Sequence, residues 1–337
     1  GGQIRLAPAR YTVVADAPTI LTPKRGLLVT KPNVHICGEG HPTITMVGLT
    51  KAYLDSLNDY ASSGRDVFTA VTFRRVSGGA VCDLHIEGEW DGVGVFRYQS
   101  PRAKGIGVIG GGGVRIENVT GANLLGNLVN ATPADATYDG ATEPCRGVRV
   151  SRCRAERTLE NGFNWMGNTF DGAIHDSEAV GCRACGVETA CTGFTATGNT
   201  LRQNAGANLA VSGQDSTVTG NSLIGAGDES GMANGIGLLI GGGRNVLVSG
   251  NTIADNHGFG VMVYPGCQQV DLLANRITRN SGHGPDPYPY QVYAVGTADQ
   301  RIADLRVLGN VLTEDRAVAA GHVLVNQCDR VTVLGNT

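Results

Sequence analysis

The sequence predicts an all-β solenoid, in which short strands wind into about 10–12 stacked coils within a single domain, residues 1–337. Three observations support this. An asparagine recurs behind a glycine or alanine about every 25 residues. The apolar residues around it alternate with polar ones, as Val246, Val248 and Ile253 do. The composition is rich in glycine and poor in aromatic residues.

The repeat is most regular between residues 191 and 256. Successive asparagines from Asn199 onwards lie 22, 30, 24, 35 and 26 residues apart, which indicates a fixed coil with loops of varying length. This region shows no 3.6-residue helical stripe, so strands build the coils. The repeated pairs are Gly198-Asn199, Gly220-Asn221, Gly250-Asn251, Ala274-Asn275, Gly309-Asn310 and Gly335-Asn336.

Composition and charge narrow the function classes. The chain has 50 glycines in 337 residues, 5% aromatic and 41% hydrophobic residues, values typical of thin strands joined by many turns. A net charge of -3 provides no basic stripe for nucleic acid, and no apolar run is long enough to span a membrane. The chain opens at Gly1-Gly2 without a signal peptide, so we expect a fragment of a longer protein.

The recurring asparagine has a physical explanation. At a tight bend its short amide tolerates left-handed backbone geometry and bonds to neighbouring groups. In stacked coils such amides bond to one another, which predicts an internal ladder. The pattern resembles the right-handed parallel β-helix of the pectate-lyase-like superfamily, whose coils carry three short strands and often an asparagine ladder at the second bend. The resemblance is specific for fold and not for reaction, because this architecture hosts lyases, hydrolases, epimerases and tailspikes.

The chain before residue 191 also divides into coils and insertions. The opening GGQIRLAPARYTV resembles the entry segment of the superfamily, although Arg10 stands where the family usually has glycine. Leu27–Met46 reads as one complete coil. We expect loop insertions near residues 50–65, 128–145 and 280–293. Long insertions in a solenoid gather on one face and form the walls of a groove.

Short apolar runs mark the first strand of each later coil. Because successive side chains of a strand point to opposite faces, alternation sorts them into core and outer sets. The predicted first strands are Ile106–Ile109, Phe163–Trp165, Gly186–Thr189, Asn208–Val211, Ile236–Ile240, Val261–Tyr264, Val292–Val295 and Val323–Asn326. The residues expected in the core are Val187, Leu209, Ile236, Leu238, Val261, Val263, Val292 and Val323. Those expected outside are Asn164, Glu188, Asn208, Ala210, Gly237, Leu239, Met262, Tyr264 and Tyr293, with Lys104 one coil earlier.

In the superfamily, sugar chains lie on this outer face, and Glu188 is the only acid in its central row. Glu188 is therefore the first catalytic candidate, and its alternative role is that of a solvated strand residue. A glycoside hydrolase needs a second carboxylate about 5 to 10 Å away. Asp228, Glu229 and Asp255 lie in nearby turns and are the available partners, since adjacent coils are about 4.8 Å apart.

A lyase instead needs a base beside a uronic carboxylate and a cation that neutralises it. Lys104, Arg183, His257 and Tyr264 are candidates for these roles. The dense ionisable cluster around His175 aligns with the second strand of its coil and is expected on another face. The residues expected to contact substrate are Lys104, Asn164, Arg183, Asn208, Tyr288, Tyr290 and Tyr293.

The nine cysteines do not indicate a metal centre. A single CxxC, Cys182 to Cys185, lacks the second pair of a zinc site, although a disulfide between these two stays open. Cys153 occupies the ladder position of its coil, which favours thiols packed in the interior. No cofactor is certain. Paired acids on adjacent coils leave calcium open, bound as in pectate lyases. The aspartate-histidine motifs of alginate epimerases are absent.

The resemblance therefore implies a secreted, extracellular or periplasmic protein that binds an extended polysaccharide along a groove and cleaves it as a lyase or glycoside hydrolase. The alternative is a phage tailspike on the virion surface, or a surface adhesin, in which the solenoid is mainly a glycan-binding shaft. Both a monomer and a homotrimer stay open. An enzyme is distinguished by two or three ionisable groups that converge within about 6 Å on the groove face.

Overall fold

A computed structural model describes residues 1–14, 24–49, 66–92, 102–134, 142–227, 235–280, 290–313 and 321–337. The regular structure in these ranges consists of thirty-three strands, β1–β33. They contain no helical segment of the length and hydrophobicity that crossing a bilayer requires. The chain divides into two compact units, Gly1–Gly172 and Ala173–Thr337. A single domain stays a prediction.

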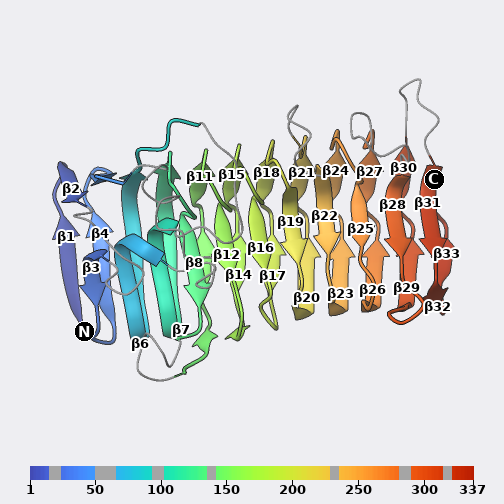
Figure 1. Cartoon of the computed structure of the whole chain (residues 1–337), viewed down its shortest axis with the longest axis horizontal. Coiled ribbons are helices and arrows are strands. Elements are labelled where there is room, and N and C mark those ends of the chain that lie inside the picture. The colour runs from blue at the N-terminus through green and yellow to red at the C-terminus, as the bar shows by residue number, and fades with distance from the viewer. Residues whose placement is uncertain are drawn as a thin grey trace. The chain divides into compact units, whose positions relative to one another are not determined.

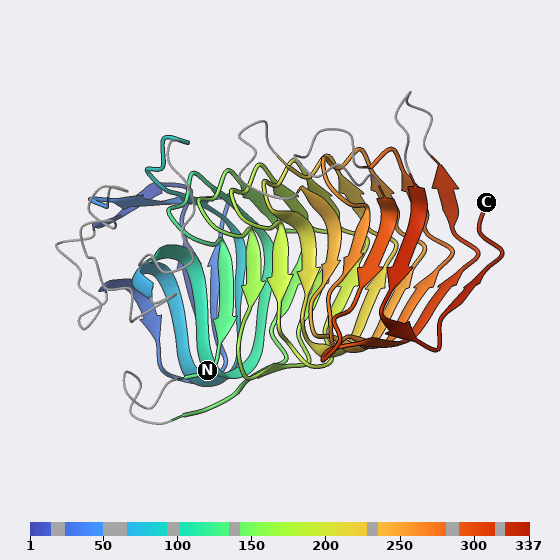
Figure 2. The same ribbon diagram turned by 45° about the vertical axis from the view of Figure 1, so that its right-hand side comes forward.

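The unit Ala173–Thr337 repeats one coil of three strands, each paired in parallel with its counterpart on the next coil (Figures 1 and 2). The first strands are β16 (Val187–Thr189), β19 (Ala207–Val211), β22 (Ile236–Ile240), β25 (Val261–Val263), β28 (Tyr290–Val295) and β31 (Gly321–Asn326). The second strands are β14 (Ala173–His175), β17 (Thr195–Thr197), β20 (Gln214–Thr219), β23 (Arg244–Ser249), β26 (Gln268–Leu273) and β29 (Ile302–Leu308), followed by β32 (Cys328–Asp329) and β33 (Thr332–Leu334), which pair with β29. The third strands are β15 (Glu178–Val180), β18 (Thr200–Arg202), β21 (Ser222–Ile224), β24 (Thr252–Ala254), β27 (Arg276–Thr278) and β30 (Val311–Thr313). This is a right-handed parallel β-helix, as predicted.

The unit Gly1–Gly172 is built on the same plan with longer strands. After β1 (Gly2–Leu6) and β2 (Arg10–Val14), the predicted coil is confirmed as β3 (Lys24–Val29), β4 (Val34–Gly38) and β5 (Thr43–Val47). The strand β6 (Asp66–Glu87) pairs with all three and continues around their bends. It is followed by β7 (Arg102–Ala122), β8 (Val129–Thr132), β9 (Cys145–Arg146), β10 (Arg149–Ser151), β11 (Arg154–Glu156), β12 (Phe163–Trp165) and β13 (Thr169–Phe170).

The insertion predicted near residues 128–145 is partly wrong. Its first residues form β8, a first strand in which Val129 lies in register between Ile106 and Phe163. The segment VNAT is too short to show a clear alternation, so the sequence pattern did not reveal it. The 50–65 insertion lies outside the described residues, and so do residues 281–289 of the third.

The asparagine ladder is confirmed. Asn199 donates from its side-chain Nδ2 to Asn221 Oδ1 at 2.8 Å and from its backbone N–H to the same oxygen at 3.0 Å. The same pair of bonds joins each asparagine to the next through to Asn336. The left-handed residue is not the asparagine but the one before it, as Gly198 (φ 68°) and Ala274 (φ 52°) show. Glycine precedes most ladder asparagines because it adopts this conformation without steric cost.

A second ladder, which the sequence reasoning missed, lies at the bend before the first strands. Asn256 Nδ2 donates to Asn280 Oδ1 at 2.7 Å, and the backbone N–H of Cys182 donates to Asn204 Oδ1 at 3.0 Å. Asn208 bridges the coils, because Asn204 donates to it and it donates to Asn256 at 3.0 Å. A signal was present: Asn204, Asn256 and Asn280 each follow an asparagine of the first ladder by five residues.

A disulfide joins Cys37 of β4 to Cys82 of β6, which are register partners with Cα atoms 4.6 Å apart. The predicted alternative, a disulfide between Cys182 and Cys185, is wrong, since neither cysteine is disulfide-bonded. Cys153 lies at the ladder position as predicted, where its Sγ accepts the backbone N–H of Val119.

We predict that Asn251→Ala lowers the free energy of unfolding by about 3–5 kcal/mol, because several buried donors and acceptors lose their partner. The control Asn245→Gly removes an exposed bond to Asp215 and is expected to cost less than about 0.5 kcal/mol, because glycine adopts the left-handed backbone of position 245 (φ 55°) without steric cost. Urea unfolding followed by circular dichroism measures both. Equal stabilities of the two variants would contradict the ladder's role.

The double variant Cys37→Ala/Cys82→Ala is expected to be about 2–4 kcal/mol less stable than the oxidised protein, because the cross-link closes a long loop of the unfolded chain. The comparison is made by thermal unfolding with and without reductant. The double variant should be insensitive to reductant, and a reductant effect of the same size in both proteins would rule out this cross-link as its cause.

Candidate functional site

The outer face of the first-strand sheet in Ala173–Thr337 carries one row of side chains in register. The paired strands place Glu188, Ala210, Leu239, Met262, Tyr293 and Leu324 in that order. Their neighbours Val187, Leu209, Leu238, Val261 and Val292 are fully buried in the core. The predicted alternation is therefore confirmed for this part of the strands.

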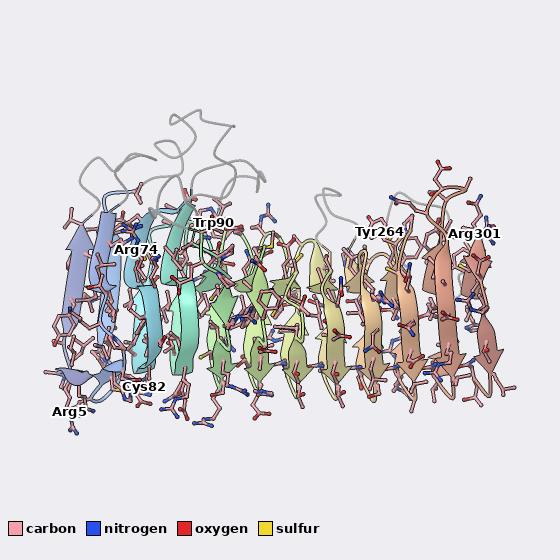
Figure 3. All side chains as sticks on the ribbon, turned by 90° about the horizontal axis from the view of Figure 1, so that it is seen from below. Arg5, Arg74, Cys82, Trp90, Tyr264 and Arg301 are labelled. Atoms are coloured by element: carbon pink, nitrogen blue, oxygen red, sulfur yellow. A yellow bond between two sulfur atoms is a disulfide. The ribbon has the colours of Figure 1, made fainter. Side chains whose placement is uncertain are left out.

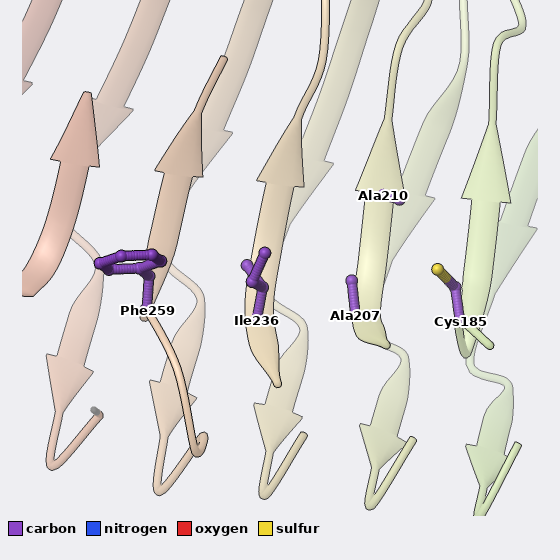
Figure 4. Close-up of a cluster of buried hydrophobic side chains, with 5 residues drawn as sticks. All are labelled: Cys185, Ala207, Ala210, Ile236 and Phe259. Carbon is purple, nitrogen blue, oxygen red and sulfur yellow. The ribbon is translucent and has the colours of Figure 1, made fainter. Parts of the chain in front are cut away.

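A second row lies nearer to the bend from which these strands emerge. Cys185, Ala207, Ile236 and Phe259 project side by side from successive coils and are buried (Figure 4). The prediction that Ile236 faces the core and Gly237 the outside is wrong. A Cβ at Gly237 would lie 2.5 Å from Cγ2 of Ile253, so position 237 faces inward. Two successive residues after the bend, Gly237 and Leu238, therefore face inward, and the alternation of the strand begins at Leu238.

Aromatic rings close this surface at the later coils. Phe259 and Tyr293 stack with ring centroids 4.4 Å apart, and Tyr290 lies 6.1 Å from Tyr293. Leu239, Met262 and both tyrosines are partly buried and pack against the second row. We call the buried and partly buried residues that pack together in these two rows the platform. They are Cys185, Ala207, Ala210, Ile236, Leu239, Phe259, Met262, Tyr290 and Tyr293.

Glu188 lies at the edge of the platform. It is half-buried on β16, and its register partner on the next coil is Ala210, whose small side chain leaves the carboxylate reachable from the outer face. Arg183 is half-buried in the turn that precedes the same strand. Glu188 is the sole acid in its row within the described part of β16–β31.

Of the three carboxylates proposed as partners of Glu188, the described residues include Asp255. Asp255 sits at a bend with φ 56° and accepts two bonds of 2.7 Å from the guanidinium of Arg279 on the next coil. Asp255 and Arg279 therefore form an ion pair that links two neighbouring coils. Asp228 and Glu229 lie outside the described residues.

His257 and Tyr264 lie at opposite ends of β25. The half-buried His257 packs against Gly227 and Gly235, where an added Cβ would lie 2.7 and 2.8 Å from that of the histidine. Tyr264 follows the strand and is 37% exposed. Its side chain is labelled in Figure 3. The two side chains are therefore separated by the strand.

Two predicted substrate contacts are buried. An added Cβ at Gly105 would lie 3.3 Å from Cδ1 of the core residue Ile86, so positions 105 and 106 both face inward. Lys104, which precedes them on β7, is 1% exposed. Asn208 is 0% exposed because it belongs to the second ladder. Tyr288 lies outside the described residues.

Asn164 faces outward in the other unit, and it is 1% exposed. Register aligns it with Asn130, Gly107 and Thr72 on the outer side of the first strands there. Asn164 Oδ1 and Thr72 Oγ1 are buried and have no hydrogen-bond partner among the described residues. Because Thr72 is 0% and Asn164 is 1% exposed, both oxygen atoms lie beneath the surface.

The described residues do not bring metal ligands together: they contain no group of three or more histidine, cysteine, aspartate or glutamate side chains. The thiols point to backbone carbonyls instead, as Cys153 does to Ile116 and Cys267 does to Ile240. Burial raises the pKa of Cys153 to about 12 and also raises the pKa of Cys267, so both are neutral thiols at physiological pH.

This fold and outer face define a parallel β-helix protein, and comparisons agree. The A-module of mannuronan C-5 epimerase AlgE4 from Azotobacter vinelandii is 17% identical, with a TM-score of 0.70 over 100% of this chain and 91% of that one. DFA-IIIase from Arthrobacter chlorophenolicus A6 is 15% identical, with a TM-score of 0.62 over 98% and 84%. Tailspike protein 3 of bacteriophage CBA120 is 15% identical, with a TM-score of 0.58 over 100% and 57%. At such identities the likeness shows the fold alone.

The family model NosD, described as periplasmic copper-binding protein, matches residues 88–285, which is more than half of the chain. The chain therefore belongs to the NosD family. No curated protein matches the sequence. The copper of the family description does not fit the described residues, because they contain no group of three or more histidine, cysteine, aspartate or glutamate side chains, and the buried thiols of Cys145, Cys153 and Cys267 donate to carbonyl oxygens.

We predict that Ellman's reagent titrates one thiol in the native protein, Cys328, which is the only one of the seven free cysteines that is not buried. All seven should react in denaturant, since the other two cysteines form the disulfide. Burial and the raised pKa of Cys153 and Cys267 explain why they stay unreactive. Rapid reaction of several thiols in the folded protein would contradict the interior placement.

Proposed function

We propose that the protein binds an extended polysaccharide along the outer face of the first-strand sheet, over the platform. The observation that carries this proposal is the register of the platform across successive coils, which ends in the stacked rings of Phe259 and Tyr293. Ligand sites combine apolar and aromatic lining with a few polar groups. Aromatic rings stack on the apolar faces of sugars, and a row that repeats every coil suits a repeating ligand.

The proposed location is outside the cytoplasm, in the periplasm or the extracellular space. The disulfide between Cys37 and Cys82 supports it, because such bonds persist in oxidising compartments. The family description names a periplasmic protein. Two of the similar structures have names that agree with this location: one is a periplasmic alginate epimerase, and the other is a bacteriophage tailspike protein. A phage or adhesin shaft, monomeric or trimeric, is the non-enzymatic form of this proposal.

Cleavage is the second candidate function, with Glu188 as the catalytic residue of a glycoside hydrolase or lyase. The half-buried carboxylate at the edge of the platform favours it. Binding is the first proposal, because the platform is fully described, whereas the carboxylates Asp228 and Glu229 that cleavage would need lie outside the described residues. Calcium would enter a lyase reaction by neutralising the carboxylate of an acidic sugar.

We predict that Tyr293→Ala weakens binding of a recognised oligosaccharide at least about tenfold, because the variant loses the stacked ring that closes the platform. A panel of acidic and neutral oligosaccharides is titrated by calorimetry. Tyr11→Ala, which changes a half-buried tyrosine on β2 in the other unit, is the matched control and should bind as the wild type does. No binding to any member of a broad panel, or equal losses in both variants, would contradict the proposal.

If the protein cleaves its ligand, Glu188→Gln is expected to abolish product formation and retain binding, because the amide keeps the shape of the side chain and loses its acid–base capacity. Reducing-end release detects hydrolysis, and ultraviolet absorbance of an unsaturated product detects a lyase. The assays are run with calcium and with a chelator. Full activity of Glu188→Gln would exclude this residue as the catalyst.

A further inference from the structure

A group of polar side chains lies on a different face, the outer side of the third sheet in Gly1–Gly172. This sheet contains β5, the last residues of β6 and β7, and β11. Two rows of register partners cross it. The first contains Thr43, His85, Thr120 and Arg154, and the second contains Thr45, Glu87, Ala122 and Glu156.

Three of these side chains form a continuous chain of hydrogen bonds. Thr120 Oγ1 lies 2.7 Å from His85 Nδ1, and His85 Nε2 lies 2.8 Å from Glu87 Oε2. A carboxylate accepts and does not donate, so Nε2 of a neutral imidazole carries the proton and Nδ1 accepts the hydroxyl proton of Thr120. The order is hydroxyl, imidazole, carboxylate.

Glu87 is itself held in place. Its second oxygen, Oε1, accepts a bond of 2.5 Å from Asn123 Nδ2. The side chains of His85 and Glu87 are 28% and 26% exposed, so they are shielded from bulk water on most sides and still open to a ligand. Asn123 therefore fixes the carboxylate, which orients the imidazole toward Thr120.

A cation lies on the same row beyond the hydroxyl. Arg154 is the register partner of Thr120 on β11, and its Nη2 donates to Glu156 Oε2 at 3.0 Å. Adjacent strands are about 4.8 Å apart. The positive charge of Arg154 favours negative charge that develops on an acyl group attacked by Thr120.

We propose that Thr120, His85 and Glu87 form a nucleophilic site for the hydrolysis of acyl esters. A nucleophile bonded to a base, with the base oriented by a third group, is the arrangement by which hydroxyls are activated. Thr120 Oγ1 bonds to the ester carbonyl carbon as its proton passes to His85 Nδ1. The ester C–O bond then breaks, and the leaving alcohol takes that proton. Water, deprotonated by His85, releases the acid and restores the hydroxyl.

This site is independent of the proposed polysaccharide binding, because it lies on the third sheet and shares no residue with the platform. The substrate class follows from the chemistry, because an activated hydroxyl attacks the carbonyl carbon of an ester. The flat strand surface around Thr120 favours an ester that projects from a larger molecule over one buried in a pocket.

The experiment uses the whole chain with a fluorophosphonate probe and with p-nitrophenyl acetate. The probe forms a P–O bond to an activated hydroxyl and releases fluoride, so tandem mass spectrometry locates it. We expect the label on Thr120 in the folded protein and none in denatured protein. His85→Gln is expected to lower both labelling and ester hydrolysis at least about tenfold.

Thr120→Val removes the hydroxyl and keeps the β-branched shape, and it should abolish labelling at this site and hydrolysis above background. Thr43→Val is the matched control, because Thr43 flanks His85 in the same row on the other side. It should behave as the wild type. Thermal unfolding verifies that each variant is folded. Absence of label on wild-type Thr120, or undiminished ester hydrolysis by folded Thr120→Val, would overturn the proposal and leave the three residues a structural network.

Discussion

The constraint on which this molecule depends is the hydrogen bonding of buried asparagine side chains between coils. From Asn221 to Asn336, each ladder Oδ1 accepts two N–H donors from the preceding coil, as Asn251 Oδ1 does from Asn221. Its Nδ2 donates both to the next ladder asparagine and to backbone carbonyls, such as that of Val218. A shift of one residue in register would leave these groups buried without partners, at a cost of about 1–3 kcal/mol each. The ladders therefore fix which side chains of neighbouring coils lie side by side.

Exposed rows follow the register that the interior sets. Several arginines meet an acid one coil away, among them Arg306 with Asp271 and Arg330 with Asp304. The hydrogen bond from Arg330 lowers the pKa of Asp304. Because the side chains of Arg330 and Asp304 are 70% and 39% exposed, solvent screens the ion pair, which therefore contributes little to stability. The platform and the chain from Thr120 to Glu87 depend on the same alignment of coils.

Much of the architecture follows from local sequence, because period-two alternation and the Gly-Asn pairs act within a single coil. The first strands around Leu209 and Val261 and the complete first ladder were predictable for this reason. The inward placement of Asn208 was not, because it depends on bonds to Asn204 and Asn256 across the coil and between coils. The rule that successive side chains point to opposite faces fails at a bend where two successive residues point inward.

Other features depend on which coils are neighbours, which spacing alone does not fix. The disulfide between Cys37 and Cys82 requires β4 and β6 to pair in one register. Thr120 and His85 likewise meet only because β6 and β7 are adjacent. The burial of Lys104, which is 1% exposed, was not predictable, because local sequence does not show which segments cover a side chain. Glu188, in contrast, lies where alternation placed it, since its strand is short and regular.

Amide hydrogen exchange resolved at single residues tests the coil register most directly. The backbone N–H groups of Ser177, Asn199, Asn221, Asn251 and Asn275 donate to a side-chain oxygen of the next coil, although each lies at a bend. We expect these amides to exchange as slowly as those of the paired core strands, because they open only when coils separate. Exchange as fast as that of exposed bend residues such as Gly242 would contradict a register held by asparagine ladders.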